Sequence, residues 1–265
     1  MTMSAINSAS QYPQSNHEPK ATIAYLTSVT DCPLEHRQNL IDAAAVLKHS
    51  IHRSSIRNPK SLSHYDYQMY AFVHTNASAC AEPLRHIGYT VLVRENPVEL
   101  YQVEKEWYRK RLTHPKAGCC QEREFLKLYS YTMLEYPLVV HLDLDFLVLK
   151  PMDELFDAFF QPDSDTKHIQ HSMWLHERQW IGRIETMFTR DYPMAKPGQQ
   201  AVKVGMQGGF LIVRPNQTAF DELVGLIRQG NFKNGWHDGT GNVHYPGVGI
   251  LVLCKRIVNT ACHVS

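Results

Sequence analysis

The stretch VVHLDLDFLVLKPMDELF, residues 139–156, places two aspartates, Asp143 and Asp145, in one of the most apolar runs of the chain. An ionised carboxylate removed from water without a partner is so unfavourable that it takes up a proton instead, so a cationic partner is expected here. The apolar run, residues 138–149, is rich in Val and Leu and too short to cross a bilayer. It therefore predicts a buried strand that reaches a loop near the aspartates.

This pair of aspartates has two interpretations. In extended backbone, residues two apart point to the same side, so both carboxylates would face one spot. A divalent metal ion suits that arrangement, because hard cations favour carboxylate oxygens and can also hold the phosphates of a substrate. Alternatively, the pair ends a strand and caps the helix that begins near Pro151, where Asp153 and Glu154 follow the preference for acids at a helix N-terminus. A bare D-x-D pattern does not decide between the two.

Length and charge narrow the class of protein. A chain of 265 residues suits one large α/β domain or two small ones. Lys and Arg nearly balance Asp and Glu, giving a formal charge of +1 without a long basic block, so neither nucleic acid nor an anionic membrane surface is predicted as a partner. No run reaches the apolar length of a membrane span, and the polar N-terminus lacks the apolar core of a signal peptide, so no membrane segment is expected.

The cysteines and glycosylation sequons leave the compartment open. The six cysteines form no C-x-x-C pair and no zinc spacing, and a chain of this size does not need disulfides to fold. Two sequons, Asn76-Ala-Ser and Asn216-Gln-Thr, matter only in a secretory lumen, and such triplets often arise by chance. Both a cytoplasmic location and the lumenal part of a Golgi enzyme remain open.

Strand and helix patterns alternate along the chain. Besides the aspartate strand, apolar runs predict strands at 22–30, 67–75, 90–95 and 208–215. Helices are predicted from about residue 31 to a basic segment at 49–60, at 79–86, 121–135 and 216–228, and after Pro151. This order predicts an α/β fold with a mostly parallel central sheet covered on both faces. Residues 1–20 are expected to form a disordered tail, and the irregular segment 161–204 is expected to bind a ligand.

Three segments, taken in order, are similar to one family: TIAYLTSVT at 22–30, FLKLYSYTMLEYPLVVHLDLDFLVLKPMDELFD at 125–157, and MQGGFLIVRPN at 206–216. The central block is the specific part. With these segments the chain resembles the family-eight retaining glycosyltransferases, the glycogenin-like group, which have a GT-A nucleotide-sugar-binding fold. The resemblance implies a single GT-A, Rossmann-like domain over 21–265, whose C-terminal part is expected to be incomplete.

The resemblance assigns the aspartates to metal and phosphate binding. Asp143 and Asp145 match the two aspartates that bind Mn²⁺ and, through it, the diphosphate of a nucleotide sugar, with Asp145 as the direct ligand. Lys127 falls where such enzymes place a lysine near the phosphates, and a cation there suits the charge that builds on the departing diphosphate. From the residue alone, a solvated helix lysine is an equal alternative.

Leu26, Thr27 and Ser28 lie at the end of the first predicted strand, where the resemblance places the base and ribose. Open α/β sheets bind ligands beyond the carboxyl ends of their strands, which agrees with this position. The alternative is ordinary strand-end packing, which is favoured for Leu26.

The chain departs from the family pattern before and after the last predicted strand. Where the family has Asn-Ser-Gly or Asn-Ala-Gly, this sequence has Gln207-Gly208-Gly209, and Gln207 can still offer an amide to a sugar hydroxyl. Asp238 falls near the position of the family's Asp-Gln-Gly, without the Gln. The resemblance assigns catalytic roles to Gln207 and Asp238. His244 is the candidate third metal ligand only by proximity, with a surface role as the alternative.

The implied activity is metal-dependent transfer of a hexose from a UDP-sugar to a hydroxyl of a glycan, protein or lipid, with retention at the anomeric carbon. UDP binding is expected to survive better than turnover in a chain of this length. One alternative is an inactive nucleotide-sugar-binding module of the same fold. Another is a phosphatase with a D-x-D nucleophile, although Leu147 stands where that group has Thr or Val, and three predicted strands precede the motif.

Overall fold

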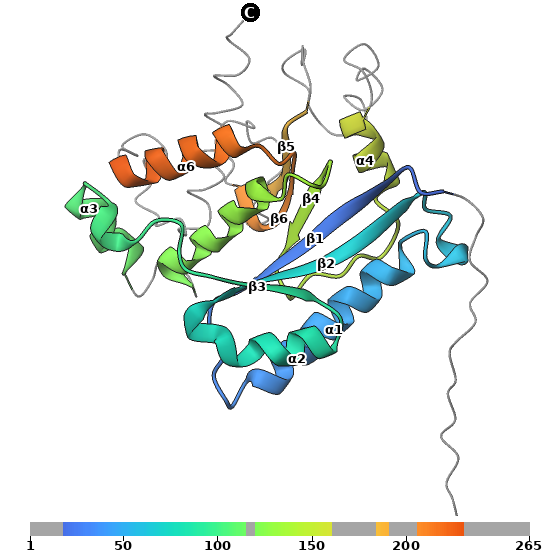
Figure 1. Ribbon diagram of the computed structural model, residues 1–265, viewed down its shortest axis with the longest axis horizontal. Coiled ribbons are helices and arrows are strands. Elements are labelled where there is room, and N and C mark those ends of the chain that lie inside the picture. Colours follow the sequence, from blue (N-terminus) through green and yellow to red (C-terminus); the bar gives the residue numbers. More distant parts are fainter. Residues whose placement is uncertain (1–17, 115–119, 161–183, 191–205, 231–265) are drawn as a thin grey trace, which may run out of the picture.

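The computed structural model describes residues 18–114, 120–160, 184–190 and 206–230, and a six-stranded sheet in the order β3-β2-β1-β4-β6-β5 lies at its centre (Figure 1). The strands are β1 Ala21–Val29, β2 Tyr65–His74, β3 Thr90–Arg94, β4 Val139–Leu142, β5 Thr186–Arg190 and β6 Met206–Val213. The α-helices are α1 Arg37–Arg53, α2 Ala81–His86, α3 Glu106–Leu112, α4 Asp153–Phe160 and α6 Gln217–Gln229. Short 3₁₀ segments are η1 Pro59–Ser61, η2 Thr75–Cys80, η3 Leu100–Gln102 and the longer η4 Gln121–Thr132.

The sheet is mostly parallel, as the sequence predicts. β1 pairs in parallel with β2 on one side and β4 on the other, and β2 pairs in parallel with β3. β6 runs antiparallel to both β4 and β5. The order 3-2-1-4 is that of the first four strands of a doubly wound sheet, so the strand order itself confirms the α/β fold class.

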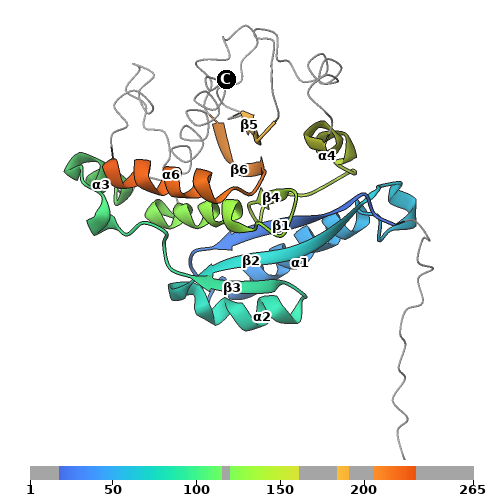
Figure 2. The same cartoon turned by 45° about the horizontal axis from the view of Figure 1, so that its top comes forward.

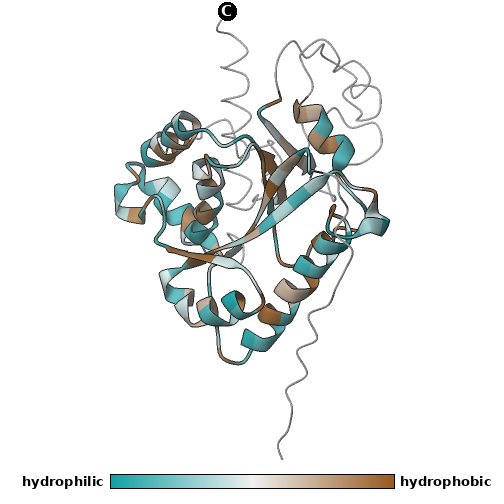
Figure 3. Cartoon of the chain, turned by 45° about the vertical axis from the view of Figure 1, so that its right-hand side comes forward, coloured by the Kyte–Doolittle hydropathy of each residue, from teal (hydrophilic) through white to brown (hydrophobic). Residues whose placement is uncertain are grey.

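Helices cover both faces of the sheet. Figure 2 shows η4, α6 and α3 on one face, and α1 and α2 on the other. Successive strand residues alternate between the two cores: Ala24 and Leu26 of β1 pack in the core beneath η4 and α6, whereas Ile23 and Tyr25 pack in the core beneath α1. Hydrophilic (teal) and hydrophobic (brown) residues alternate along the helices in Figure 3, as expected for amphipathic helices.

The strand that leads to the aspartates is shorter than predicted. β4 ends at Leu142, and the backbone then turns, with the Phe146 amide donating to the Asp143 carbonyl at 3.2 Å. The later part of the apolar run is not a buried strand, because Leu149 is 87% exposed. The backbone between Asp143 and Asp145 turns and is not extended, so the predicted strand is wrong here and gives no reason for both carboxylates to face one spot.

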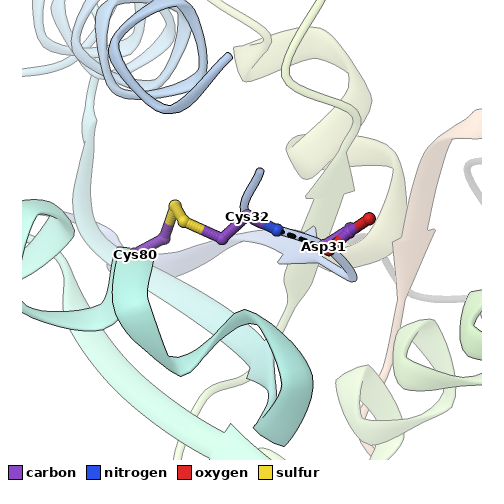
Figure 4. Close-up of a disulfide and its surroundings, with 3 residues drawn as sticks. All are labelled: Asp31, Cys32 and Cys80. Atoms are coloured by element: carbon purple, nitrogen blue, oxygen red, sulfur yellow. Dashed lines mark hydrogen bonds between the residues drawn. A yellow bond between two sulfur atoms is a disulfide. The ribbon is translucent and has the colours of Figure 1, made fainter. Parts of the chain in front are cut away.

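A disulfide joins the connections that follow β1 and β2, which the sequence did not predict. Cys32 and Cys80 are bonded, with their Cα atoms 5.9 Å apart (Figure 4). In the same view the Asp31 carboxylate accepts a hydrogen bond from the Cys32 amide at 2.8 Å. The bond fixes the loop after β1 against η2.

Candidate functional site

The carboxyl ends of β1 and β4 meet at the point where the strand order changes direction. β2 and then β3 lie on one side of β1, and the chain returns to place β4 on the other side of β1. In open α/β sheets, ligands bind in the crevice outside the carboxyl ends at this point. Ser28 of β1 and Asp143, directly after β4, lie there, so two of the sequence-predicted residues share the expected position.

Lys127 is the cationic partner that the apolar run requires. Its ammonium lies 2.9 Å from the Asp143 carboxylate and 2.6 Å from that of Glu124, one turn earlier in η4. It also donates to the Gly208 carbonyl of β6 at 3.2 Å. Lys127 is only 6% exposed, so the alternative of a solvated helix lysine is wrong.

The charges of this cluster shift each other's pKa. Burial by itself would lower the pKa of Lys127, but the carboxylates of Glu124 and Asp143 outweigh it and raise that pKa, so the ammonium stays charged. Burial raises the pKa of Asp143; Lys127 opposes this, while Glu124 and Asp145 add to the rise. The charged ammonium of Lys127 is thus held by the carboxylates of Glu124 and Asp143 near the carboxyl end of β4.

His141 links β1, β4 and η4 behind this cluster. Its Nδ1 lies 2.9 Å from the Ser130 hydroxyl and its Nε2 lies 3.2 Å from the Ser28 hydroxyl. Burial, together with the nearby charge of Lys127, holds the pKa of His141 well below its usual value. The ring is therefore neutral, and because it has one donor and one acceptor nitrogen it orients both hydroxyls.

The three candidates on β1 differ in position. Leu26 packs in the core beneath η4, and Thr27 is 0% exposed on the opposite side of the strand. Ser28 is the one of the three with exposed surface, and it lies on the His141 side. Packing therefore accounts for Leu26, while Ser28 has the position of a ligand-binding group. The Thr27 hydroxyl is buried without a hydrogen-bond partner in the described part of the chain, and we have no physical account of it.

The glycines of β6 close the site from the other side of β4. The Asp143 amide donates to the Gly209 carbonyl at 3.0 Å, next to the contact of Lys127 with Gly208. Gln207 precedes them on the same strand, but its side chain lies outside what the structure describes. Gly208 and Gly209, which follow Gln207, thus lie beside the lysine and the first aspartate.

Asp145 is exposed on the turn after β4, whereas the Asp143 side chain is 39% exposed. Carboxylate oxygens are what hard divalent cations prefer, and ions of the Mg²⁺ type retain waters or substrate phosphates. Among the described residues, no group of three or more His, Cys, Asp and Glu side chains could hold a metal. The donors therefore fit an ion that water or phosphate oxygens complete, rather than a closed protein cage.

Two predicted residues, Asp238 and His244, lie outside the described residues, as does most of the segment 161–204. Their roles remain predictions. Within the described ranges, no helix is long and apolar enough to span a membrane.

Glu124, Ser130 and His141 belong to the site but were not predicted from the sequence. Glu124 had a signal, since it lies three residues before Lys127 and helical residues at that spacing are neighbours. His141 is a polar residue in an otherwise apolar strand, which also marks a buried hydrogen-bonded group. Ser130 had no such signal.

Comparisons with known proteins find weak structural likenesses and no sequence match. No family model and no curated protein matches the sequence. Among solved structures, mouse xyloside xylosyltransferase 1 is similar with a TM-score of 0.48 and 14% identity, over 89% of this chain and 82% of that one. The glycosyltransferase GlyE of Streptococcus pneumoniae TIGR4 has a TM-score of 0.42 and 14% identity, over 91% of this chain and 44% of that one. An active-site mutant of LgtC has a TM-score of 0.40 and 12% identity, over 73% of this chain and 57% of that one.

These likenesses are to glycosyltransferases, but they are weak, and this chain spans less than half of GlyE. The strand order and the ion pairs define an α/β protein with charged side chains at the switch point of its sheet. Membership of family eight stays a prediction.

Proposed function

We propose that this chain binds a UDP-sugar in the crevice between β1 and β4 and transfers its hexose to a hydroxyl acceptor with retention of configuration. The observation that supports the proposal is the ion pair of Lys127 with Asp143 directly after β4, next to the carboxyl end of β1 that carries Ser28. The sequence suggested the two aspartates as a pair and Lys127 beside them. The ion pair adds a buried positive group next to the first aspartate, and Asp145 follows on the exposed turn.

Asp143 and Asp145 would hold a divalent cation, with Mn²⁺ as the ion implied by the family resemblance. The local cluster contains three carboxylates, from Glu124, Asp143 and Asp145, against the single ammonium of Lys127. Such an excess of negative charge favours a cation, and a bound ion would supply Lewis acidity toward the leaving diphosphate. With this excess of negative charge, an anionic nucleotide would bind here only together with a metal.

Lys127 would contact the phosphates of the donor. Its ammonium is held in position by Glu124 and by the Gly208 carbonyl, so it needs little reorganisation to meet an oxyanion beside Asp143. In the reaction the bond between the anomeric carbon and the diphosphate oxygen breaks, and the acceptor oxygen bonds to that carbon on the same face. The acceptor proton goes to solvent or to the departing diphosphate.

Ser28 would hold the ribose or base, because its hydroxyl is oriented by the neutral His141. Gln207 and Asp238 are the proposed contacts to the sugar. A lumenal or a cytoplasmic location, and a glycan, protein or lipid acceptor, are all compatible with this reaction.

The second candidate is a module that binds UDP without turning over its sugar. It is favoured by the contact of Lys127 with one of the two aspartates, which pairs that carboxylate without a metal. The phosphatase alternative has less support, since β1, β2 and β3 precede the motif.

Titrating the purified chain with UDP in the presence and absence of Mn²⁺ or Mg²⁺, followed by turnover assays with a panel of UDP-sugars, separates the three functions. A transferase binds UDP with Mn²⁺ and consumes the sugar in an acceptor-dependent way. A binding module gives the first result without the second. A phosphatase prefers Mg²⁺ and does not respond to uridine, and this last result would contradict the proposal.

A further inference from the structure

The disulfide between Cys32 and Cys80 indicates the environment in which the chain matures. Both cysteines are buried, Cys80 with 0% exposure, so the bond forms as the loops after β1 and β2 pack together. Disulfides form and persist in oxidising compartments and are rare where glutathione keeps thiols reduced. This structural feature is independent of the proposed activity.

A sequon lies in the same short segment as one of the two cysteines. Asn76, Ala77 and Ser78 belong to η2, which ends at Cys80. Asn76 and Ser78 are exposed, whereas Ala77 between them is buried in the core. The acceptor amide and the hydroxyl of the sequon therefore both face outward, while Ala77 and the disulfide anchor the segment from beneath.

We infer that this chain matures in an oxidising secretory compartment and that Asn76 is its N-glycosylation site. An Asn in an N-x-Ser triplet is modified only in a secretory lumen, which is also where the disulfide forms. The co-reactant is an oligosaccharide carried on a polyprenyl diphosphate. The Asn76 Nδ2 bonds to the anomeric carbon while the bond from that carbon to the phosphate oxygen breaks; polyprenyl diphosphate leaves, and the Nδ2 proton goes to solvent. Formation of the disulfide from the two thiols releases two protons and two electrons, and a thiol oxidant of the compartment takes up the electrons.

The second sequon has a structural explanation that Asn76 lacks. The Asn216 side-chain carbonyl accepts a hydrogen bond from the Ala219 amide at 3.2 Å and caps α6. Its hydroxyl residue, Thr218, already lies in the first turn of that helix. An asparagine at this position is favoured by helix capping alone, so Asn216 needs no glycan to account for it.

The test is translation of the full chain behind a cleavable secretory signal with endoplasmic-reticulum microsomes. We expect a discrete loss of gel mobility that endoglycosidase H reverses, and that disappears in both Asn76→Gln and Ser78→Ala. Asn216→Asp is the matched control: it removes the other sequon, keeps a good helix cap, and is expected to leave the Asn76 glycan in place. Melting temperatures of the variants check that each one folds.

Three results would overturn the inference. The first is wild-type product without a glycan. The second is a glycan that persists in Asn76→Gln and is lost in Asn216→Asp. The third is recovery of Cys32 and Cys80 as free thiols from the microsomal product, because the disulfide would then not form even in an oxidising lumen.

Discussion

At the scale of single residues, the two aspartates of the apolar run are in different surroundings. Asp143 is partly buried and paired with Lys127, whereas Asp145 is exposed on the following turn. One buried ammonium, shared with Glu124, compensates the carboxylate that is removed from water. A divalent cation would have to compete with that ammonium for Asp143. Lys127 is therefore expected to weaken the binding of a metal ion and to strengthen the binding of the nucleotide.

Replacing Lys127 with Met is therefore expected to change metal and nucleotide binding in opposite directions. Without nucleotide, Mn²⁺ should bind more tightly, because the ammonium 2.9 Å from Asp143 no longer competes. UDP in the presence of Mn²⁺ should bind more weakly by about 1.5–3 kcal/mol, the cost of one lost charge-assisted hydrogen bond. Calorimetric titrations of Mn²⁺ alone, and of UDP at saturating Mn²⁺, measure the two effects.

Lys150→Met is the matched control, since it removes the same charge from an exposed position shortly after the aspartates. It should change neither affinity appreciably. Equal or weaker Mn²⁺ binding by Lys127→Met in the absence of UDP would show that Lys127 does not restrain Asp143.

His141 predicts a pH dependence of stability. Its folded-state pKa lies below the unfolded value of about 6.5, so below that pH the unfolded chain binds a proton that the folded chain does not. Its contribution to stability is thus fully present above about pH 6.5 and falls, by at most about 1.4 kcal/mol per pH unit, as the pH drops toward the folded pKa.

Urea unfolding of wild type and His141→Gln between pH 7 and 5 tests this. The variant should lose stability less steeply than wild type with falling pH. Parallel slopes for His141→Gln and wild type would mean that the His141 ring takes up its proton equally readily in the folded and the unfolded chain.

At the scale of elements, the apolar runs predicted the strands where pairing and burial coincide. β1, β2 and β3 agree with their predicted segments to within a few residues. β4 is shorter than its predicted segment, because the run of Val and Leu continues past Leu142 into residues that do not pair with another strand. Hydrophobicity alone cannot distinguish paired strand residues from unpaired ones. Lys127 and Asp143 were predicted, but their ion pair was not, since it depends on how η4 packs on the sheet.

The disulfide was also beyond prediction, because six cysteines allow many pairings and its two cysteines lie 48 residues apart. Closing a loop of that length should stabilise the fold by about 2–4 kcal/mol. We expect reductant to lower the free energy of unfolding of wild type by this amount, and to leave a Cys32→Ala/Cys80→Ala variant unaffected. Identical urea midpoints for oxidised and reduced wild type would refute the stabilising role.

At the scale of the whole molecule, the polar groups of the site lie at the carboxyl ends of β1 and β4, while the cores on the two faces of the sheet are mainly apolar. Ser28, Asp143 and Asp145 lie at or directly after the ends of these two strands, and Lys127 reaches them from η4 on one face of the sheet. The loops after β1 and β2, joined by the disulfide, border the same end of the sheet. Within the described part of the chain, we therefore expect the ligand to bind at this charged end of the sheet.

The most direct test is the thermodynamic coupling between Mn²⁺ and UDP in wild type and in Asp145→Ala. Because an ion held by Asp143 and Asp145 would join the carboxylates to the diphosphate, each ligand should increase the affinity for the other in wild type. Asp145→Ala should fold normally and lose that coupling, while Asp42→Ala, at an exposed position of α1 beneath the opposite face, should retain it. Metal-dependent UDP binding that persists unchanged in Asp145→Ala would contradict the assignment of this site.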